Sequence, residues 1–294
     1  MTILLGVLVE GLAYAIMALG VYITYKILDF PDLSVDGTFP LGGAITAVLI
    51  IAGVNPLLTL LISFIVGGFA GMITGIIHVK FKVRDLLSGI IMMTALYSIN
   101  LRIAGKTNLP IFSKETIFEN TFLTNTIPTG LQPFTDTIIL LIIVVIMKLL
   151  LDLYLKTRSG YLLRSVGDND TLVTSLAKDK GTVKIIGLAI ANAFVALAGS
   201  IYTQKSGFFE NSLGTGTIVI GLASVIIGTN LFKRFSAVKA TTAVIIGSVI
   251  YKACVSFALS LGLAASDLKL ITSILFLLIL ILGYDRKRKV KTNA

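Results

Sequence analysis

The chain has 294 residues and a formal net charge of +10, which in a soluble protein would indicate one or two domains and a nucleic-acid partner. Its composition excludes both: 55% of the residues are hydrophobic, 14% are charged, and the mean hydropathy is +0.95. Soluble domains are about a quarter charged, so this chain has too little polar surface for a globule in water. We therefore expect an all-α, polytopic membrane helix bundle forming a single domain over 1–294, without a nucleic-acid partner.

Apolar segments long enough for membrane helices follow one another along the chain. A membrane helix needs about 20 mostly apolar residues. The candidate spans are 3–27, 40–54, 57–78, 86–104, 137–155, 183–203, 214–232, 237–260 and 268–284. The run at 40–54 is short for a crossing, so we expect about 8–10 spans. The first run is too long for the apolar part of a cleaved leader, and we expect it to be retained.

Two polar segments interrupt this pattern, one in each half of the chain. The first, 29–40, holds two prolines, a glycine and three carboxylates; the second, 208–217, holds Glu210, Asn211 and two glycines before an apolar run. Paired interruptions of this kind indicate a transport pathway, and a helix starting there would offer free N–H groups to an anion. The candidate pathway residues are Asp32, Ser34, Asp36, Thr38, Glu210, Asn211, Gly214 and Gly216.

Alternatives stay open for both segments. The segment 29–40 is either an ordinary loop or a broken helix that lines a pathway, because irregular backbone at membrane depth requires protein or water around it. Both segments could equally be loops that only cap the helices after them.

The basic residues predict which loops face the cytoplasm. Seventeen of the 25 Lys and Arg residues lie in four segments, namely 78–85, 156–184, 232–239 and 284–294. Cytoplasmic loops carry the excess of Lys and Arg. We therefore place 78–85, 156–182, 232–237 and the basic tail 284–294 in the cytoplasm. The loops 105–136, 204–213 and 261–267 are then outward-facing, and nine crossings put the N terminus outside.

A few ionisable residues lie inside the predicted spans, where they are costly and commonly functional. Lys148 and Asp152 are spaced i, i+4 and can form a pair on one helix face. Glu10 lies in the first span, and Lys252 either has a buried partner or extends its ammonium group to the interface. Separately, Gly67, Gly71 and Gly75 form a stripe that favours close helix packing, with an oligomer interface or a moving surface as the alternatives.

The sequence contains no recognisable catalytic or metal-binding set. Cys254 and His78 are the only residues of their types, which excludes a metal cluster of several such ligands, and we expect His78 in a solvated loop. Ala104–Thr107 resembles the end of a phosphate-binding loop, but the first glycine of that motif is replaced by Asn100 and no strand precedes it. We therefore expect no catalytic residues, no metal and no cofactor in this chain. If ATP powers the protein, another subunit must bind the ATP and Mg²⁺.

The loop 156–182 is charged and amphipathic, with Leu162, Leu163 and Val166 at helical spacing, which indicates a docking surface for a cytoplasmic partner. Thr157–Gly160, Leu163–Gly167 and Asn169 resemble the inner-loop pattern of the branched-chain amino acid and ribose type permeases of binding-protein-dependent ABC importers. In this sequence Ser165 replaces the usual alanine, and Asp170 stands where proline is common. By this resemblance Gly160, Arg164, Gly167 and Asn169 belong to a coupling helix that contacts the ATPase.

Two further segments resemble one branch of this family, which is often linked to uptake of tryptophan or tyrosine. They are Asp32–Phe39 with Leu41–Ala44, and Gly221–Gly228. The resemblance implies a multi-pass subunit of the bacterial cell membrane with a cytoplasmic C terminus. Its implied partners are a cytoplasmic ABC ATPase, an extracellular or periplasmic solute-binding (lipo)protein, a second permease chain forming a homodimer, and a small solute, with an aromatic amino acid favoured. The residues alone leave open an ATP-independent carrier or channel, or a membrane scaffold.

Overall fold

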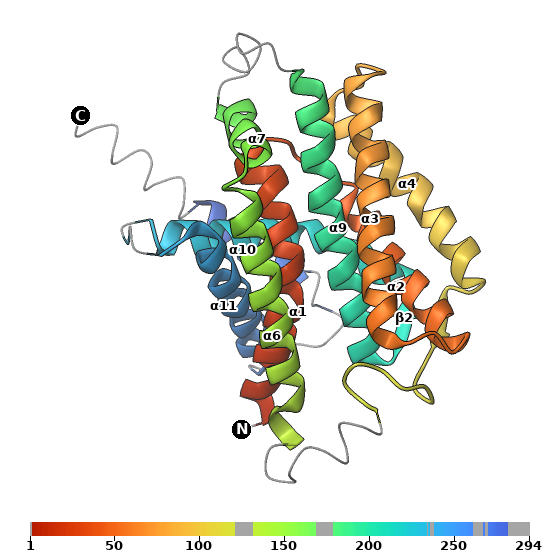
Figure 1. Cartoon of the computed structure of the whole chain (residues 1–294). Coiled ribbons are helices and arrows are strands. Elements are labelled where there is room, and N and C mark those ends of the chain that lie inside the picture. The colour runs from red at the N-terminus through yellow and green to blue at the C-terminus, as the bar shows by residue number, and fades with distance from the viewer. Residues whose placement is uncertain are drawn as a thin grey trace.

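Seven helices long and apolar enough to cross a membrane dominate the computed structural model (Figure 1), which describes residues 2–120, 132–168, 179–233, 235, 238–260, 267 and 270–281. The elements are α1 (Thr2–Val21), η1 (Tyr22–Ile27), α2 (Val35–Ile51), α3 (Pro56–Val79), α4 (Asp85–Ala104), β1 (Asn108–Pro110), η2 (Gln132–Phe134), α6 (Thr135–Tyr154), α7 (Arg158–Asp168), α9 (Lys180–Ser206), β2 (Phe208–Glu210), η3 (Asn211–Gly214), α10 (Thr217–Leu231) and α11 (Ala240–Ser260). Besides these seven, the described residues include two shorter apolar helices, α2 and Leu270–Ile281. The predicted all-α polytopic bundle is confirmed.

The glycine stripe of α3 packs against α9 within the same chain. A Cβ atom built on Gly71 would lie 2.2 Å from the carbonyl oxygen of Leu188, and one built on Gly67 would lie 2.3 Å from the Ala196 side chain. Gly75 faces Ile185 in the same way, at 2.8 Å. Only hydrogen fits at these positions, so the stripe allows two backbones to approach closely in an apolar surrounding.

The opposite face of α3 carries exposed Leu61, Ile65, Phe69 and Ile73, each one turn from the next. Exposed large apolar side chains at this spacing form a continuous apolar face, which suits contact with lipid tails. Helix α6 has a similar face, with Leu141, Val145 and Leu149 exposed. The bundle therefore buries its small residues between helices and presents its large aliphatic residues outward.

Between α1 and α2 the helix is interrupted. α1 ends in the π-helical segment η1, and residues 28–34 follow without regular helix before α2 starts at Val35. Asp29 has a positive φ of 50°, which an aspartate tolerates better than most residues. The predicted break is present but shorter than expected, because residues 35–40 belong to α2 and Pro40 lies inside that helix.

Two short strands were not predicted. β1 and β2 pair antiparallel, with Leu109 opposite Phe209. They follow α4 and α9, which end in left-handed glycines, Gly105 and Gly207. Gly105 of the rejected phosphate-loop motif is thus a helix cap. Figure 1 shows that α7 and the first turns of α9 lie at one end of the bundle and the N terminus at the other.

His78 is another correction, because it lies in the last turn of α3 and not in a solvated loop. It is half-buried, its Nδ1 lies 2.9 Å from the Val83 carbonyl oxygen, and its ring meets Phe30 edge-on at 5.0 Å between centroids. The imidazole therefore joins the end of α3 to the interruption after η1.

Asp179 caps the start of α9 just before its first helical residue. Its carboxylate accepts hydrogen bonds from the Thr182 hydroxyl (2.7 Å) and from the amides of Gly181 (2.9 Å) and Thr182 (3.2 Å). These bonds favour the ionised form and lower the pKa of Asp179.

Candidate functional site

Asp32, in the interruption between η1 and α2, is held by a buried polar network. Its carboxylate accepts a hydrogen bond from the Asn192 side-chain amide of α9 (2.8 Å) and one from the Ser34 backbone amide (2.9 Å). The Ser34 hydroxyl donates to the Asn192 carbonyl oxygen at 3.2 Å. All three side chains are almost fully buried. The network joins the irregular backbone to the centre of α9. It also gives these buried polar groups the hydrogen-bond partners that burial requires.

Asp36 connects the two polar segments that the sequence places 180 residues apart. Its carboxylate accepts hydrogen bonds from the amides of Gly216 and Ile218, both at 2.8 Å, and from the Thr217 hydroxyl at 3.0 Å. These donors form the start of α10, and Gly216 is in the left-handed conformation there. A side chain of α2 therefore caps α10, and the two segments form one junction.

This cap corrects the expectation that α10 offers free N–H groups to an anionic solute, because Asp36 occupies them. At α2 the Ser34 amide donates to Asp32, and the Gly37 and Thr38 amides donate to the Ser34 carbonyl oxygen. The Thr38 hydroxyl is buried and also donates to the Ser34 carbonyl oxygen, at 3.0 Å. The amides at both helix starts are thus largely satisfied within the protein.

The remaining candidate residues surround the same junction. Gly214 packs on α2, and a Cβ atom there would lie 2.0 Å from the Asp36 carbonyl oxygen and 2.6 Å from the Pro40 ring. The Asn211 side-chain amide donates to the Tyr97 carbonyl oxygen at 3.1 Å, while its side-chain oxygen is buried and has no hydrogen-bond partner among the described residues. Glu210 accepts a hydrogen bond from the Ser212 hydroxyl. All eight residues therefore belong to connected parts of the fold, and their part in transport stays a prediction.

Helix α7 confirms the predicted helix in the inner loop. Leu163 and Val166 are buried, whereas Tyr161 and Arg164 are exposed on the opposite side. Asn169 and the rest of the loop up to 178 lie outside the described residues. α7 thus has one face on the bundle and one face available to a partner.

Glycines set how closely α7 approaches the rest of the chain. A Cβ atom on Gly167 would lie 1.7 Å from the carbonyl oxygen of Ile27, the last residue of η1. A Cβ atom on Gly160 would lie 2.3 Å from the carbonyl oxygen of Tyr154, at the end of α6. Leu163 reaches Gly187 of α9. Helix α7 is therefore in backbone contact with η1, directly before the interruption at 28–34.

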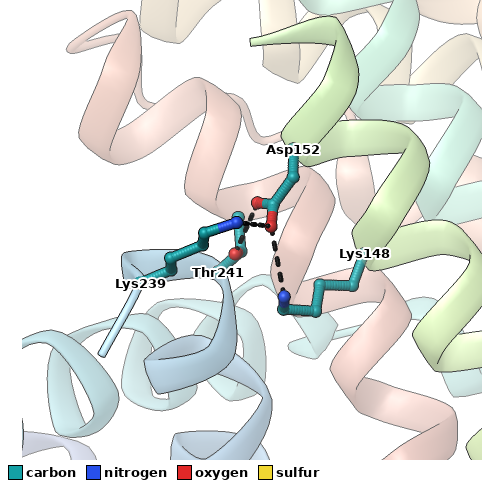
Figure 2. Close-up of polar contacts among 4 residues, drawn as sticks. All are labelled: Lys148, Asp152, Lys239 and Thr241. Atoms are coloured by element: carbon teal, nitrogen blue, oxygen red, sulfur yellow. Dashed lines mark hydrogen bonds and ion pairs between the residues drawn. The ribbon is translucent and has the colours of Figure 1, made fainter. Parts of the chain in front are cut away.

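A charged cluster connects the last turns of α6 to the start of α11 (Figure 2). Asp152 accepts from Lys148 at 3.1 Å, which confirms the predicted i, i+4 pair, and from Lys239 at 3.2 Å. Its other oxygen accepts from the Thr241 hydroxyl at 2.7 Å. The carboxylate is thus shared by two cations, and α6, which leads into α7, is tied to α11.

Glu10 and Lys252, the two other charged residues noted in the predicted spans, form a second pair. Glu10 Oε2 of α1 lies 3.1 Å from Lys252 Nζ of α11. Lys252 therefore has a partner, but that partner is not buried as expected, because the Glu10 side chain is 57% exposed. The sequence does not indicate that these two residues pair, whereas Asn192 carried a signal that was missed, since a polar side chain within an apolar span is commonly functional. Within the described residues no group of three His, Cys, Asp or Glu side chains is placed to hold a metal ion.

The whole chain has relatives among membrane transport proteins. The profile of the branched-chain amino acid transport system permease component matches residues 3–283. The chain belongs to this permease family.

The permease is 46% identical to the tyrosine transport system permease protein of Clostridioides difficile, over 99% of this chain and 95% of that protein. It is 24% identical to the ribose import permease protein of Escherichia coli, over 76% of this chain and 68% of the relative. It is 26% identical to a probable branched-chain amino acid transport permease protein of Methanocaldococcus jannaschii, over 68% of this chain and 65% of that protein. No solved structure matches it significantly.

Proposed function

We propose that this permease forms the membrane pathway of an ATP-driven importer for an amino acid, with an aromatic amino acid favoured. The observation that carries the proposal is the full-length similarity to a tyrosine transport system permease, at 46% identity. The interruption at 28–34 and its junction with α10 supply the irregular, polar backbone that transport proteins place along a pathway. The permease itself binds no cofactor, and ATP and Mg²⁺ are bound by a separate ABC ATPase.

The end of the bundle that carries α7 is proposed to face the cytoplasm of a bacterial cell. The basic segments 78–85 and 156–184 contain most of the α3–α4 and α6–α9 connections, and the positive-inside rule assigns such segments to the cytoplasm. The strands β1 and β2 and the N terminus are then on the outer side, where a solute-binding (lipo)protein delivers the substrate. The C-terminal tail, 284–294, carries five basic residues and is placed in the cytoplasm by the same rule.

Helix α7 is proposed to couple the ATPase to the pathway. The exposed Arg164 offers a cation to an acidic or polar rim on the ATPase, and the buried face passes the movement on. Because Gly167 touches the backbone of Ile27, a shift of α7 displaces η1 and then the interruption that holds Asp32 and Asp36. π-Helical turns are frequent at functional sites, which fits a segment that must deform. A second permease chain would complete the pathway as a homodimer.

Uptake by cells tests this function. A strain that lacks the gene should lose high-affinity uptake of radiolabelled L-tyrosine, and the intact gene should restore it. Depletion of ATP should stop this uptake, whereas a proton ionophore at constant ATP should leave it unchanged. Uptake that follows the proton gradient and ignores ATP would show a secondary carrier and refute the proposal.

A further inference from the structure

A cavity of about 650 Å³ lies between the start of α1, the end of α9, the junction of η3 with α10, the second half of α11 and the helix Leu270–Ile281. This volume falls in the range of about 300–1,000 Å³ for small-molecule sites. The cavity is at the end of the bundle opposite α7, because α7 contacts η1 at the far end of α1. Among the candidate pathway residues, Gly216 is in its lining.

The cavity contains one acid and one base in direct contact. Glu10 and Lys252 line it and form the ion pair at 3.1 Å. Lys252 is held further by the ring of Tyr14, whose centroid lies 4.1 Å from Nζ, a cation–π distance. Charges inside a membrane protein need partners, and this pair provides them when the cavity is empty. A zwitterion can replace each partner with a like charge, its carboxylate facing Lys252 and its ammonium facing Glu10.

Aromatic rings form the wall beside this ion pair. Tyr14 and Tyr202 both line the cavity, with centroids 5.5 Å apart and a tilt of 57°. Phe39 of α2 supports both rings from behind, stacked on Tyr14 at 5.8 Å and tilted against Tyr202 at 5.8 Å. Aromatic groups associate at such distances in stacked or tilted geometry. A planar side chain on the bound solute would extend this cluster.

We infer that this cavity binds an amino acid zwitterion with an aromatic side chain, through Lys252 at the carboxylate, Glu10 at the ammonium group, and Tyr14 and Tyr202 at the ring. The inference rests on the proposed function, and it adds the site and the atoms that distinguish this class of solute. Because Phe39 and Asp36 lie on the same helix α2, the ring cluster also connects the site to the junction with α10.

Binding of radiolabelled L-tyrosine to the purified full chain in lipid nanodiscs tests the site. The competitors are tyramine, which lacks the carboxylate, 3-(4-hydroxyphenyl)propionate, which lacks the ammonium group, and L-alanine, which lacks the ring. L-Tyrosine should compete best and L-alanine worst. Lys252→Met should weaken L-tyrosine binding about tenfold or more and leave tyramine binding unchanged, because one charged hydrogen bond is lost. Glu10→Gln should weaken L-tyrosine binding by a similar factor and leave the binding of 3-(4-hydroxyphenyl)propionate unchanged.

Lys205→Met is the matched control. Lys205 also forms an ion pair, with Asp136, and lies 5.7 Å from the centroid of the Phe118 ring, but it does not line the cavity. This variant should bind L-tyrosine as the wild type does. A second measurement leaves both charges in place. The variant Cys254→Ser with Ser256→Cys has one thiol, which lies in the cavity because Ser256 lines it. L-Tyrosine should prevent labelling of this thiol by a maleimide.

Two results would overturn the inference. Equal weakening of L-tyrosine and tyramine by Lys252→Met, or labelling of Ser256→Cys unaffected by L-tyrosine, would show that the cavity is not the binding site. If ATP-driven L-tyrosine uptake by the reconstituted complex then persisted in both charge variants with unchanged KM, the proposed function would stand and the site would be wrong. A wild-type complex that imports no L-tyrosine would instead refute the proposed substrate and, with it, this inference.

Discussion

Asp36→Ala is the substitution that most directly tests the junction between the two halves of the permease. The carboxylate of Asp36 accepts from two backbone amides, Gly216 and Ile218, at 2.8 Å each, and from the Thr217 hydroxyl at 3.0 Å. Thr217 keeps a second partner, the Gly214 carbonyl oxygen at 3.0 Å. The variant therefore leaves two amide donors at the start of α10 without an acceptor.

The cost follows from those two amides. Loss of a capping side chain typically destabilises a helix by about 0.5–2 kcal/mol, and a buried donor left unsatisfied costs about 1–3 kcal/mol. Asp36 is half-buried, so water reaches the amides in part. We therefore expect a loss of about 2–3 kcal/mol of unfolding free energy, and Tm should fall by about 5 °C or more.

Thermal unfolding of the purified permease in detergent, followed by loss of the monodisperse peak in size-exclusion chromatography, measures this change. Asp36→Asn retains one carbonyl acceptor and should lose less. Asp85→Ala is the matched control, because Asp85 also lies in a first helical turn, but the one hydrogen bond of its side chain within the described part of the chain comes from the neighbouring Leu86 amide, at 2.9 Å. A Tm for Asp36→Ala within the spread of the Asp85→Ala control would refute the reasoning.

Three further predictions concern α7 and the glycine stripe. Arg164→Glu should abolish ATP-driven uptake while the protein still reaches the membrane, because the side chain is exposed on α7; uptake at the wild-type rate would remove its coupling role. Gly167→Ala places a Cβ atom 1.7 Å from the Ile27 carbonyl oxygen, so the assembled complex should hydrolyse ATP with little uptake. An unchanged ratio of uptake to hydrolysis would contradict this. Gly71→Ala should destabilise the bundle by about 1–3 kcal/mol, whereas Gly68→Ala, whose Cβ atom would have no neighbour nearer than 3.6 Å, should fold as the wild type does. Equal melting of these two variants would argue against the tight packing of α3 on α9.

The helices of the bundle were predictable because each depends on the composition of its own segment of the chain. Each apolar run of about 20 residues must form a helix in lipid, since its backbone polar groups have no other partners there. The spacing of Leu163 and Val166 predicted α7 for the same kind of reason, since one face of a short amphipathic helix must be buried. The interruption at 29–40 was visible from its prolines and carboxylates, although its end was placed six residues too late.

The junction was not predictable, because its contacts depend on tertiary packing. Nothing local indicates that Asp36 caps a helix 180 residues further on, or that Asn192 holds Asp32. Carboxylates near helix starts were expected to leave the amides free for a solute, and the fold uses Asp36 to occupy them. Glu10 and Lys252 were each noticed as charges in apolar spans, but their pairing requires knowing that α1 packs against α11.

Transport by reconstituted protein tests the central claim most directly. Liposomes that contain the permease alone should take up no L-tyrosine down its gradient. Liposomes that also contain the ATPase with enclosed ATP, and the binding protein outside, should accumulate L-tyrosine against its gradient, and a non-hydrolysable ATP analogue should stop this. Movement of L-tyrosine through the permease alone, at a rate that ATP and the ATPase do not change, would contradict the account.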